Sequence, residues 1–171
     1  MDGLETILGR RSCRSYTDTP VPDDVIETLL RAGMYAPSAN NSQPWEFLVV
    51  REKEMREAAS VFGPYWGPLK DAPLGIFVLA NMNVYGEAVS PMFVQDCAAA
   101  TENILLAVRA LGLGGVWLGL YPREERIEPV RKLFGIPENV VPVALISIGY
   151  PSEEAAPHTE FYADKVHYDK Y

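Results

Sequence analysis

Hydrophobic residues along the chain recur with helical spacing in some segments and form the short apolar runs of strands in others. The pattern predicts helices over residues 4–8, 22–33, 52–61, 90–111 and 122–134. It predicts strands over residues 45–50, 74–80, 116–120 and 141–148. Residues 62–68 contain two glycines and two prolines, which predicts a loop without a regular element. Because helices alternate with strands, the fold class is expected to be α/β or α+β.

Two of these segments lack a polar face. Residues 74–80 are an unbroken apolar run, which is typical of a strand buried on both sides. The helix over residues 90–111, with Ser90 as its expected cap, is apolar almost all round. Such a helix lies at the centre of a molecule or at a subunit interface. Residues 150–171 form a polar, tyrosine-rich tail with no clear period, which predicts little core of its own.

The composition fits one globular domain over residues 1–171, with 48% hydrophobic and 22% charged residues. The formal charge of −8 argues against a nucleic-acid partner, which would require a broad basic face. No apolar segment reaches the length of a membrane span, and no secretory leader is visible, so neither a membrane partner nor export is predicted. Cys13 and Cys97, without a CxxC motif, fit the reducing cytoplasm.

No side-chain pattern in the sequence is typical of acid–base or metal catalysis. His158 and His167 belong to no ligand-like cluster, so no metal site is predicted. The glycines of residues 112–115 suggest a dinucleotide loop, but they follow a helix, and Trp117 occupies the third glycine position of that motif. A helix C-cap with a tight turn is the favoured interpretation. A cofactor is therefore expected to carry any chemistry, with no catalytic side chain.

Three arginines, Arg10, Arg11 and Arg14, lie within five residues of an otherwise acidic chain. Guanidinium groups can bind two oxygens of one phosphate at once, so the cluster suggests a specific anion site. The alternative is a solvated helix end, where cations also favour the helix dipole. Nearby cations favour the thiolate form of a cysteine, but the sequence leaves open whether Cys13 is reactive.

A second candidate segment, residues 36–45, follows a predicted amphipathic helix and precedes a predicted strand. Its small and amide-bearing side chains offer hydrogen bonds to a planar polar ligand. Proline, serine and asparagine also favour turns, so a plain connecting loop is the alternative for this segment taken alone.

Taken together, the order of these motifs resembles the nitroreductase family of FMN-dependent oxidoreductases. The resemblance includes RRSCRSY at residues 10–16, PSANNSQPW at residues 37–45, and Gln95-Asp96 at the start of an alanine-rich stretch. It continues through ALGLGGVWLG at residues 110–119 and the ending Val166-His167-Tyr168. Each motif is loose by itself, but their order covers nearly the whole chain, and its length matches the short members of the family.

The resemblance implies an α+β sandwich with a mixed, mainly antiparallel sheet wrapped by helices. It also implies an intertwined homodimer that holds two FMN molecules at the subunit interface. The apolar helix over residues 90–111 would then meet a partner surface, and the tail of residues 150–171 would reach across the dimer.

Roles in cofactor binding follow by analogy with the family. Arg10 and Ser12 would hold the FMN phosphate, with Arg11 beside them or directed to solvent. Arg14 would lie near the pyrimidine edge of the flavin, where a fixed cation stabilises the reduced form.

Two further groups are implied in the same way. The other subunit would contribute contacts to the flavin ring or the ribityl chain from Pro37, Ser38, Ala39 and Asn41. Leu118 and Gly119 would lie beside the flavin N5, where a small residue lets the backbone approach closely.

The implied activity is the reduction of nitroaromatics, quinones or related small acceptors by NAD(P)H, with the hydride passing through the flavin N5 in a ping-pong reaction. An FMN-binding storage or delivery protein without turnover is the alternative, because its cofactor site would look the same. A dehalogenase or flavin-fragmenting relative would need a lid, for which residues 61–74 leave little room. The aromatic loop of residues 62–66 would either line the acceptor pocket or pack as a surface loop.

One segment departs from the family pattern. Many members carry basic residues after the last strand, whereas this chain has His158 and Glu160 there. His158 could still donate a hydrogen bond, but Glu160 would repel a phosphate. FMN is therefore expected to bind more weakly than in relatives with two cations at these positions.

Overall fold

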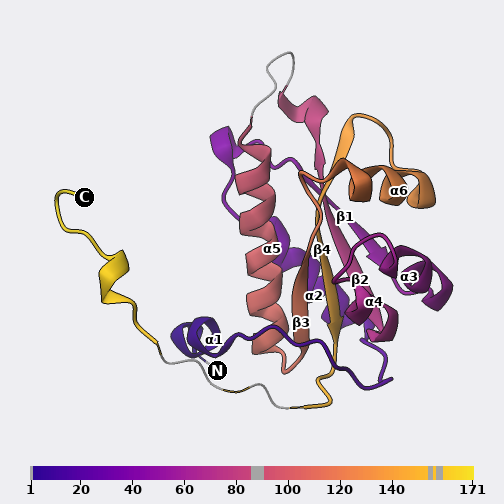
Figure 1. Cartoon of the computed structure of the whole chain (residues 1–171), viewed down its shortest axis with the longest axis horizontal. Helices are drawn as coiled ribbons and strands as arrows, with labels where there is room; N and C mark the ends of the chain where they lie inside the picture. Colours follow the sequence, from indigo (N-terminus) through magenta and orange to yellow (C-terminus); the bar gives the residue numbers. More distant parts are fainter. Residues whose placement is uncertain (1, 86–90, 154–155, 157–159) are drawn as a thin grey trace.

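The computed structural model describes residues 2–85, 91–153, 156 and 160–171 (Figure 1). Within these ranges the strands are β1 (Trp45–Val50), β2 (Leu74–Asn81), β3 (Gly114–Gly119) and β4 (Val140–Gly149). The α-helices are α1 (Gly3–Gly9), α2 (Asp23–Met34), α3 (Lys53–Ser60), α4 (Gly67–Asp71), α5 (Phe93–Ala110) and α6 (Glu124–Phe134). Short 3-10 turns are η1 (Ala39–Asn41), η2 (Met82–Tyr85) and η3 (Ala163–Lys165).

The strands form one sheet in the order β1-β2-β4-β3, with every neighbouring pair antiparallel. A bulge between Val78 and Leu79 shifts the register of β2 against β4. A parallel pairing occurs at the isolated bridge between Ser12 and Gly115, beside the free edge of β3. The mainly antiparallel α+β fold expected from the sequence is confirmed.

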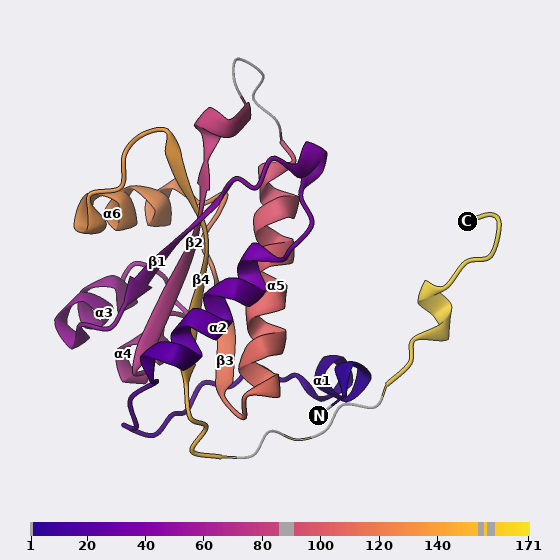
Figure 2. The ribbon, with the colours of Figure 1, turned by 180° about the vertical axis from the view of Figure 1, so that it is seen from behind.

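Helices cover both faces of the sheet and make a three-layer sandwich (Figures 1 and 2). On one face α2 and α5 pack over a core that includes Ile76 and Val78 of β2. On the other face α3, α4 and α6 enclose a second core that includes Phe77 and Leu79 of the same strand. The predicted burial of residues 74–80 on both sides is therefore confirmed.

The segment predicted as a loop without a regular element is only partly irregular, and that expectation was wrong for its end. Helix α4 begins at Gly67, and Pro68 lies in its first turn, where the missing N–H interrupts no helical hydrogen bond. Trp66, at 1% exposure, fills the core under α3, α4 and α6. It therefore cannot line an acceptor pocket, whereas Tyr65 beside it is exposed.

The glycine run after α5 combines a turn with the start of a strand. Gly112 has a φ of 73°, which ends the helix in the conformation that favours glycine. Gly114 and Gly115 already belong to β3, so the strand starts two residues earlier than predicted. At the other end, α5 begins at Phe93, and the predicted cap Ser90 lies outside the described residues.

The tail leaves the body of the molecule (Figures 1 and 2). Every residue from Glu160 to Tyr171 is exposed, including those of η3. None of the helices in the described ranges is long and apolar enough to cross a membrane.

Candidate functional site

The arginine-rich segment runs along the free edge of β3. Ser12 forms the parallel bridge with Gly115, and the Cys13 N–H donates to the Gly115 carbonyl at 3.0 Å. Further along, the Thr17 N–H donates to the Tyr150 carbonyl at 2.9 Å. Backbone hydrogen bonds to the ends of β3 and β4 thus hold residues 12–17 in a defined path.

A glycine and a tyrosine keep this path close to the sheet. A Cβ on Gly114 would lie 2.6 Å from the Cys13 Sγ, so the segment approaches β3 only because residue 114 has no side chain. The Tyr16 hydroxyl donates to the Cys13 carbonyl at 2.7 Å and lies 2.8 Å from the Ser147 Oγ. Burial raises the pKa of Tyr16, so its hydroxyl remains a donor at neutral pH.

The three arginines have different surroundings. Arg10 Nε pairs with Glu102 Oε1 of α5 at 3.2 Å. Arg11 turns back, and its guanidinium donates to the Leu8 carbonyl at 3.0 Å and the Ala156 carbonyl at 3.1 Å. Arg14 is exposed. The partner of Arg10 comes from a helix far along the chain, so no sequence spacing could have revealed it.

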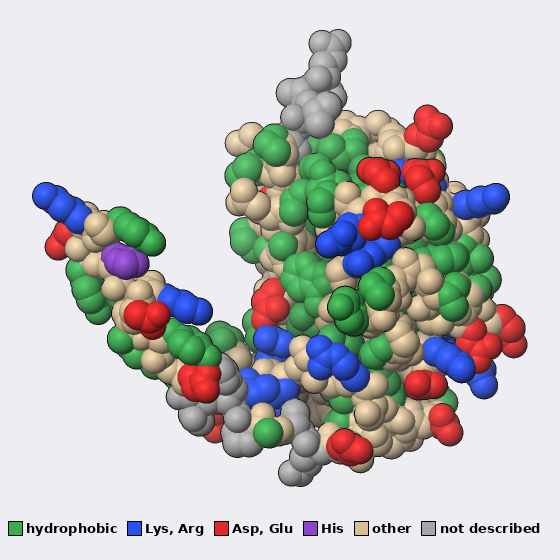
Figure 3. Space-filling model, viewed as in Figure 1, with side chains coloured by type: hydrophobic (Ala, Val, Ile, Leu, Met, Phe, Trp, Pro, Cys, Tyr) green, Lys and Arg blue, Asp and Glu red, His purple; other side chains and the backbone are tan. Residues whose placement is uncertain are grey.

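A cavity of about 1130 Å³ opens beside Arg10 and Arg11. Its apolar side is formed by α5 and β3, through Leu105, Val108 and Leu113. Glu160 and Phe161 of the tail also line it, and His158 lies outside the described residues. Figure 3 shows basic side chains close together at the base of the body, near the start of the tail. Among the described residues, the charged lining comprises three arginines, Arg10, Arg11 and Arg109, and two glutamates, Glu153 and Glu160. The arginines beside an apolar wall can hold a ligand that carries both an anionic group and a flat apolar one.

The second predicted group, residues 37–41, lies around η1. Pro37 and Asn41 are exposed, while Ser38 and Ala39 are partly buried. Asn40, Asn41 and Gln43 have φ values of 52°, 54° and 47°, the left-handed region that side chains disfavour. Such a conformation persists only where its surroundings hold it.

The two groups lie near opposite ends of α5, a helix of 18 residues and therefore about 27 Å long. The Ala39 N–H donates to Asp96 in the first turn of α5, at 2.9 Å. At the other end, a Cβ on Gly9 would lie 3.2 Å from Arg109 Nε. Figure 2 shows η1 and α1 at the two ends of the helix. One chain therefore does not bring residues 37–41 next to the arginine segment.

The third predicted group lies at the far end of β3. The Leu118 side chain is buried in the core beneath α3, α4 and α6, so only its backbone is available to a ligand. Gly119 is exposed, and its carbonyl accepts from Arg126 Nη1 at 2.6 Å and Trp66 Nε1 at 3.3 Å. These two donors fix the orientation of the Gly119–Leu120 peptide. No sequence pattern indicates either contact, because both depend on how α6 and residue 66 pack.

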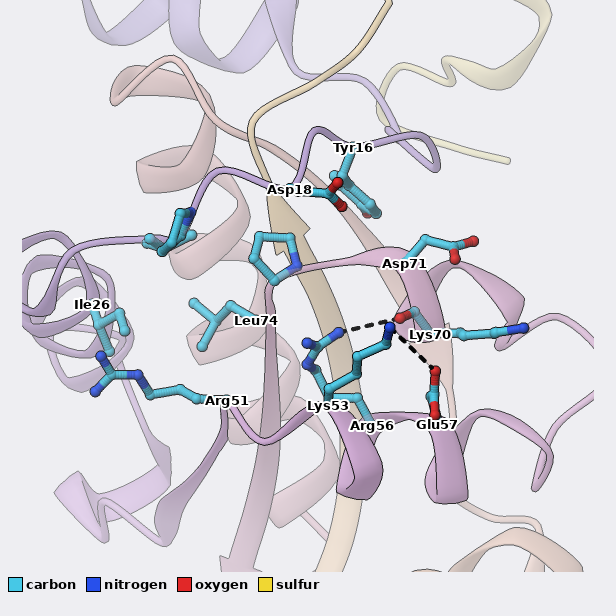
Figure 4. Close-up of a pocket in the computed structure, with 13 residues that line it drawn as sticks. Tyr16, Asp18, Ile26, Arg51, Lys53, Arg56, Glu57, Lys70, Asp71 and Leu74 are labelled. Atoms are coloured by element: carbon cyan, nitrogen blue, oxygen red, sulfur yellow. Dashed lines mark hydrogen bonds and ion pairs between the residues drawn. The ribbon is translucent and has the colours of Figure 1, made fainter.

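A separate cavity of about 630 Å³ lies at the end of the sheet where β2 begins (Figure 4). Its charged lining comprises Asp18, Arg51, Lys53, Arg56, Glu57, Lys70 and Asp71. Lys53 pairs with Glu57 at 3.9 Å, and Arg51 pairs with Asp23 at 2.6 Å. Acidic and basic groups thus largely compensate one another here.

Arg56 in this cavity has a structural role. It is 7% exposed, and its Nη1 donates to the carbonyls of Leu69, Lys70 and Ala72 at the end of α4. The guanidinium therefore supplies hydrogen bonds that the last turn of a helix cannot make for itself. Burial lowers the pKa of Arg56.

Replacing Arg56 by methionine is expected to destabilise the fold by about 2 kcal/mol, because buried carbonyls lose their donor. Chemical denaturation monitored by circular dichroism measures the change. Lys53→Met is the matched control, since Lys53 lies in the same cavity but is exposed and pairs with Glu57 at 3.9 Å. Equal stability of the two variants would contradict the capping role.

Comparison with known proteins adds to this geometry. A family model described as the Nitroreductase family matches residues 7–66 and 63–150. A protein of Methanothermobacter thermautotrophicus, provisionally assigned as an NADH dehydrogenase or NAD(P)H nitroreductase, is 45% identical over 171 residues. That match covers 100% of this chain and 88% of the relative.

Solved structures show the same fold. The crystal structure of a provisionally assigned NADH oxidase from Clostridium acetobutylicum has a TM-score of 0.92 at 44% identity, covering 97% of this chain and 99% of that one. An FMN-dependent nitroreductase from Clostridium difficile R20291 has a TM-score of 0.90 at 28% identity, covering 98% and 99%. The expected nitroreductase-like sandwich is confirmed, and the chain belongs to the nitroreductase family.

Proposed function

We propose that this chain is an FMN-dependent NAD(P)H oxidoreductase that acts as a homodimer on nitroaromatic, quinone or related small acceptors. Family membership supports the reaction class, since relatives are named as NAD(P)H nitroreductases and as an FMN-dependent nitroreductase. The observation that carries the proposal is the arginine segment, held along the edge of β3 beside a cavity of about 1130 Å³.

The residues on this edge fit FMN. Arg10, Ser12 and Arg14 offer charge and a hydroxyl to a phosphate or to the flavin ring, and Arg11 lines the same cavity. At the other end of β3, exposed Gly119 leaves its backbone open to a flat ring. An anion near Arg10 would share that guanidinium with Glu102, whose pairing at 3.2 Å is partly exposed and therefore weak.

A homodimer would complete the site. Residues 37–41 and the arginine segment lie near opposite ends of α5, so two chains could supply the two groups to one cofactor. The exposed tail supports the same proposal, because its aromatic side chains lack a core in their own protomer.

The protein's part in the reaction would be to position the cofactor and the substrates and to stabilise charge on the ring. When bound, FMN supplies the capacity to take up and release a hydride. Arg14 would favour negative charge on the ring beside it, and Gly119 would leave one edge of the ring accessible. Substrates would exchange in one open pocket, which predicts ping-pong kinetics.

The visible spectrum of the purified protein, followed without oxygen, tests this function. We expect a yellow protein whose absorbance near the flavin band bleaches promptly on addition of NADH or NADPH and returns on addition of a quinone. A yellow protein that stays oxidised would instead indicate FMN storage or delivery. A colourless protein that takes up no FMN on titration would contradict the proposal altogether.

Glu160→Arg is expected to tighten FMN binding about fivefold, because it replaces a repulsive charge on the rim of the cavity by an attractive one. Fluorescence titration of the apoprotein with FMN measures the change. Asp164→Arg makes the same charge change four residues along the exposed tail and is the control. Identical dissociation constants for wild type and Glu160→Arg would show that residue 160 does not face the phosphate.

A further inference from the structure

Asp96 is a buried carboxylate, 4% exposed, in the first turn of α5. Its Oδ1 accepts the Ala39 N–H at 2.9 Å. Its Oδ2 accepts the Tyr85 hydroxyl at 2.8 Å and the Ser42 hydroxyl at 3.3 Å. These hydrogen bonds and the nearby helix N-terminus offset the cost of burying the charge. The carboxylate thereby joins the turn around η1 and the residues of η2 to the start of α5.

The hydrogen bonds to Ala39 and Ser42 enclose the most unusual backbone in the described structure. Between these two residues lie Asn40 and Asn41, with φ values of 52° and 54°. The Gln43 N–H, also on a left-handed residue, donates to Ser38 Oγ at 3.0 Å. One carboxylate thus holds the residue before and the residue after the left-handed pair, as a clamp across the turn.

Tyr85 fixes the clamp from the other side. Burial, together with the nearby Asp96 carboxylate, raises the pKa of Tyr85 to about 12. Its hydroxyl therefore keeps its proton at neutral pH and remains a donor to Oδ2. The carboxylate is held in one orientation, with Oδ1 directed at the Ala39 N–H.

We propose that Asp96 is a positioning residue for the cofactor: it holds residues 38–42 in the turn whose centre, Asn40 and Asn41, is left-handed, so that Asn41 and Ser38 are already arranged to contact the flavin of the partner subunit. This inference rests on the proposed function, because it assumes that residues 37–41 contact FMN. Asp96 itself is buried, so it acts on the cofactor through Ala39 and Ser42. Pre-organisation of this kind strengthens binding, because the strained conformation need not be formed when the ligand arrives.

Amide hydrogen exchange tests the clamp without any cofactor. In Asp96→Ala we expect faster exchange at the amides of residues 39, 42 and 43, while the centre of the sheet keeps its protection. The exchange rates of Asp96→Asn should lie between those of wild type and Asp96→Ala, since the Oδ1 of the introduced asparagine can still accept the Ala39 N–H. Thr101→Val is the matched control: this buried hydroxyl of α5 donates to the Cys97 carbonyl within the same helix, at 2.7 Å.

FMN titration tests the consequence for the cofactor. Asp96→Ala should bind FMN about tenfold more weakly, the effect of losing charge-assisted hydrogen bonds that pre-organise the turn. Asp96→Asn should recover most of that loss, and Thr101→Val should match wild type. If Asp96→Ala does not fold, Ser42→Ala removes one part of the clamp at a partly buried position and should produce the same local exchange and a smaller loss of affinity.

The outcomes separate the clamp from the assignment of the site. Unchanged exchange over residues 38–43 in Asp96→Ala, or in Ser42→Ala, would overturn the clamp. Asn41→Gly keeps the left-handed backbone but removes the amide, so unchanged FMN affinity in this variant would overturn the contact between this turn and the flavin. If Asn41→Gly weakens FMN binding while Asp96→Ala leaves it unchanged, the proposed site stands and the positioning role is wrong.

Discussion

A chain that ends at Glu153 is expected to fold as a monomer and to lose most of its affinity for FMN. The truncation keeps the backbone–backbone hydrogen bonds of the arginine segment, including the Ser152 N–H to Ser15 carbonyl hydrogen bond at 3.1 Å, and removes the Ala156 carbonyl that accepts from Arg11. It removes a tail in which Phe161 is 79% and Tyr168 is 83% exposed. Burial of each such side chain in a partner contributes about 1.5–3 kcal/mol, so their loss would remove a large part of the dimer's stability.

Sedimentation equilibrium and FMN titration measure these two effects. We expect the full chain to sediment as a dimer, and the truncated chain as a monomer whose affinity for FMN is at least about 100-fold lower, since half of the site would be missing. The double substitution Phe161→Ser and Tyr168→Ser should reproduce much of the effect. Val61→Ser with Tyr65→Ser is its control, because these two residues are equally exposed on the body. A truncated chain that remains a dimer with full affinity would show that the tail does not cross to a partner.

Gly114→Ala is expected to displace the arginine segment from β3 and to lower FMN affinity by about 10- to 100-fold, together with about 1–3 kcal/mol of stability. The new Cβ would lie 2.6 Å from Cys13 Sγ and 2.7 Å from Cys13 Cβ, closer than carbon and sulfur can approach. The Ser12–Gly115 bridge and the Cys13 N–H hydrogen bond would then stretch or break. The cations would lose their fixed position over the cavity.

A compensating substitution makes this prediction specific. Cys13→Gly removes both clashing atoms, so the double variant Gly114→Ala with Cys13→Gly should recover most of the FMN affinity lost by Gly114→Ala alone. Gly67→Ala is the control for a simple change of glycine, because its added Cβ would meet no atom within 4 Å. Fluorescence titration and thermal unfolding of wild type, the two single variants and the double variant measure the coupling, with Gly67→Ala measured beside them. Additive effects of the two substitutions would contradict the steric explanation.

Much of the fold could be predicted because local pattern and burial coincide. The unbroken apolar run of residues 74–80 is the central strand β2, with core on both faces, and its alternation assigns Ile76 and Phe77 to opposite layers. The end of α6 at Gly135, with a φ of 66°, follows from the rule that a glycine ends a helix. The prediction of a loop over residues 62–68 was wrong at its end, because a proline at a helix start resembles a proline in a turn. Helix α4 is stabilised there by the packing of Leu69 and Trp66 in the core.

For the candidate site, too, some features could be predicted from the sequence and others could not. The sequence by itself determined the types of group available: a local cluster of arginines, an amide-rich turn, and glycines where backbones come close. Only the tertiary structure decided where they lie. It set the arginine segment beside β3, placed residues 37–41 near the opposite end of α5, and joined Asp96 to a turn 57 residues earlier in the chain. Periodicity reports which face of an element is buried, but a hydrogen bond between distant segments depends on how whole elements pack, and no local spacing records it.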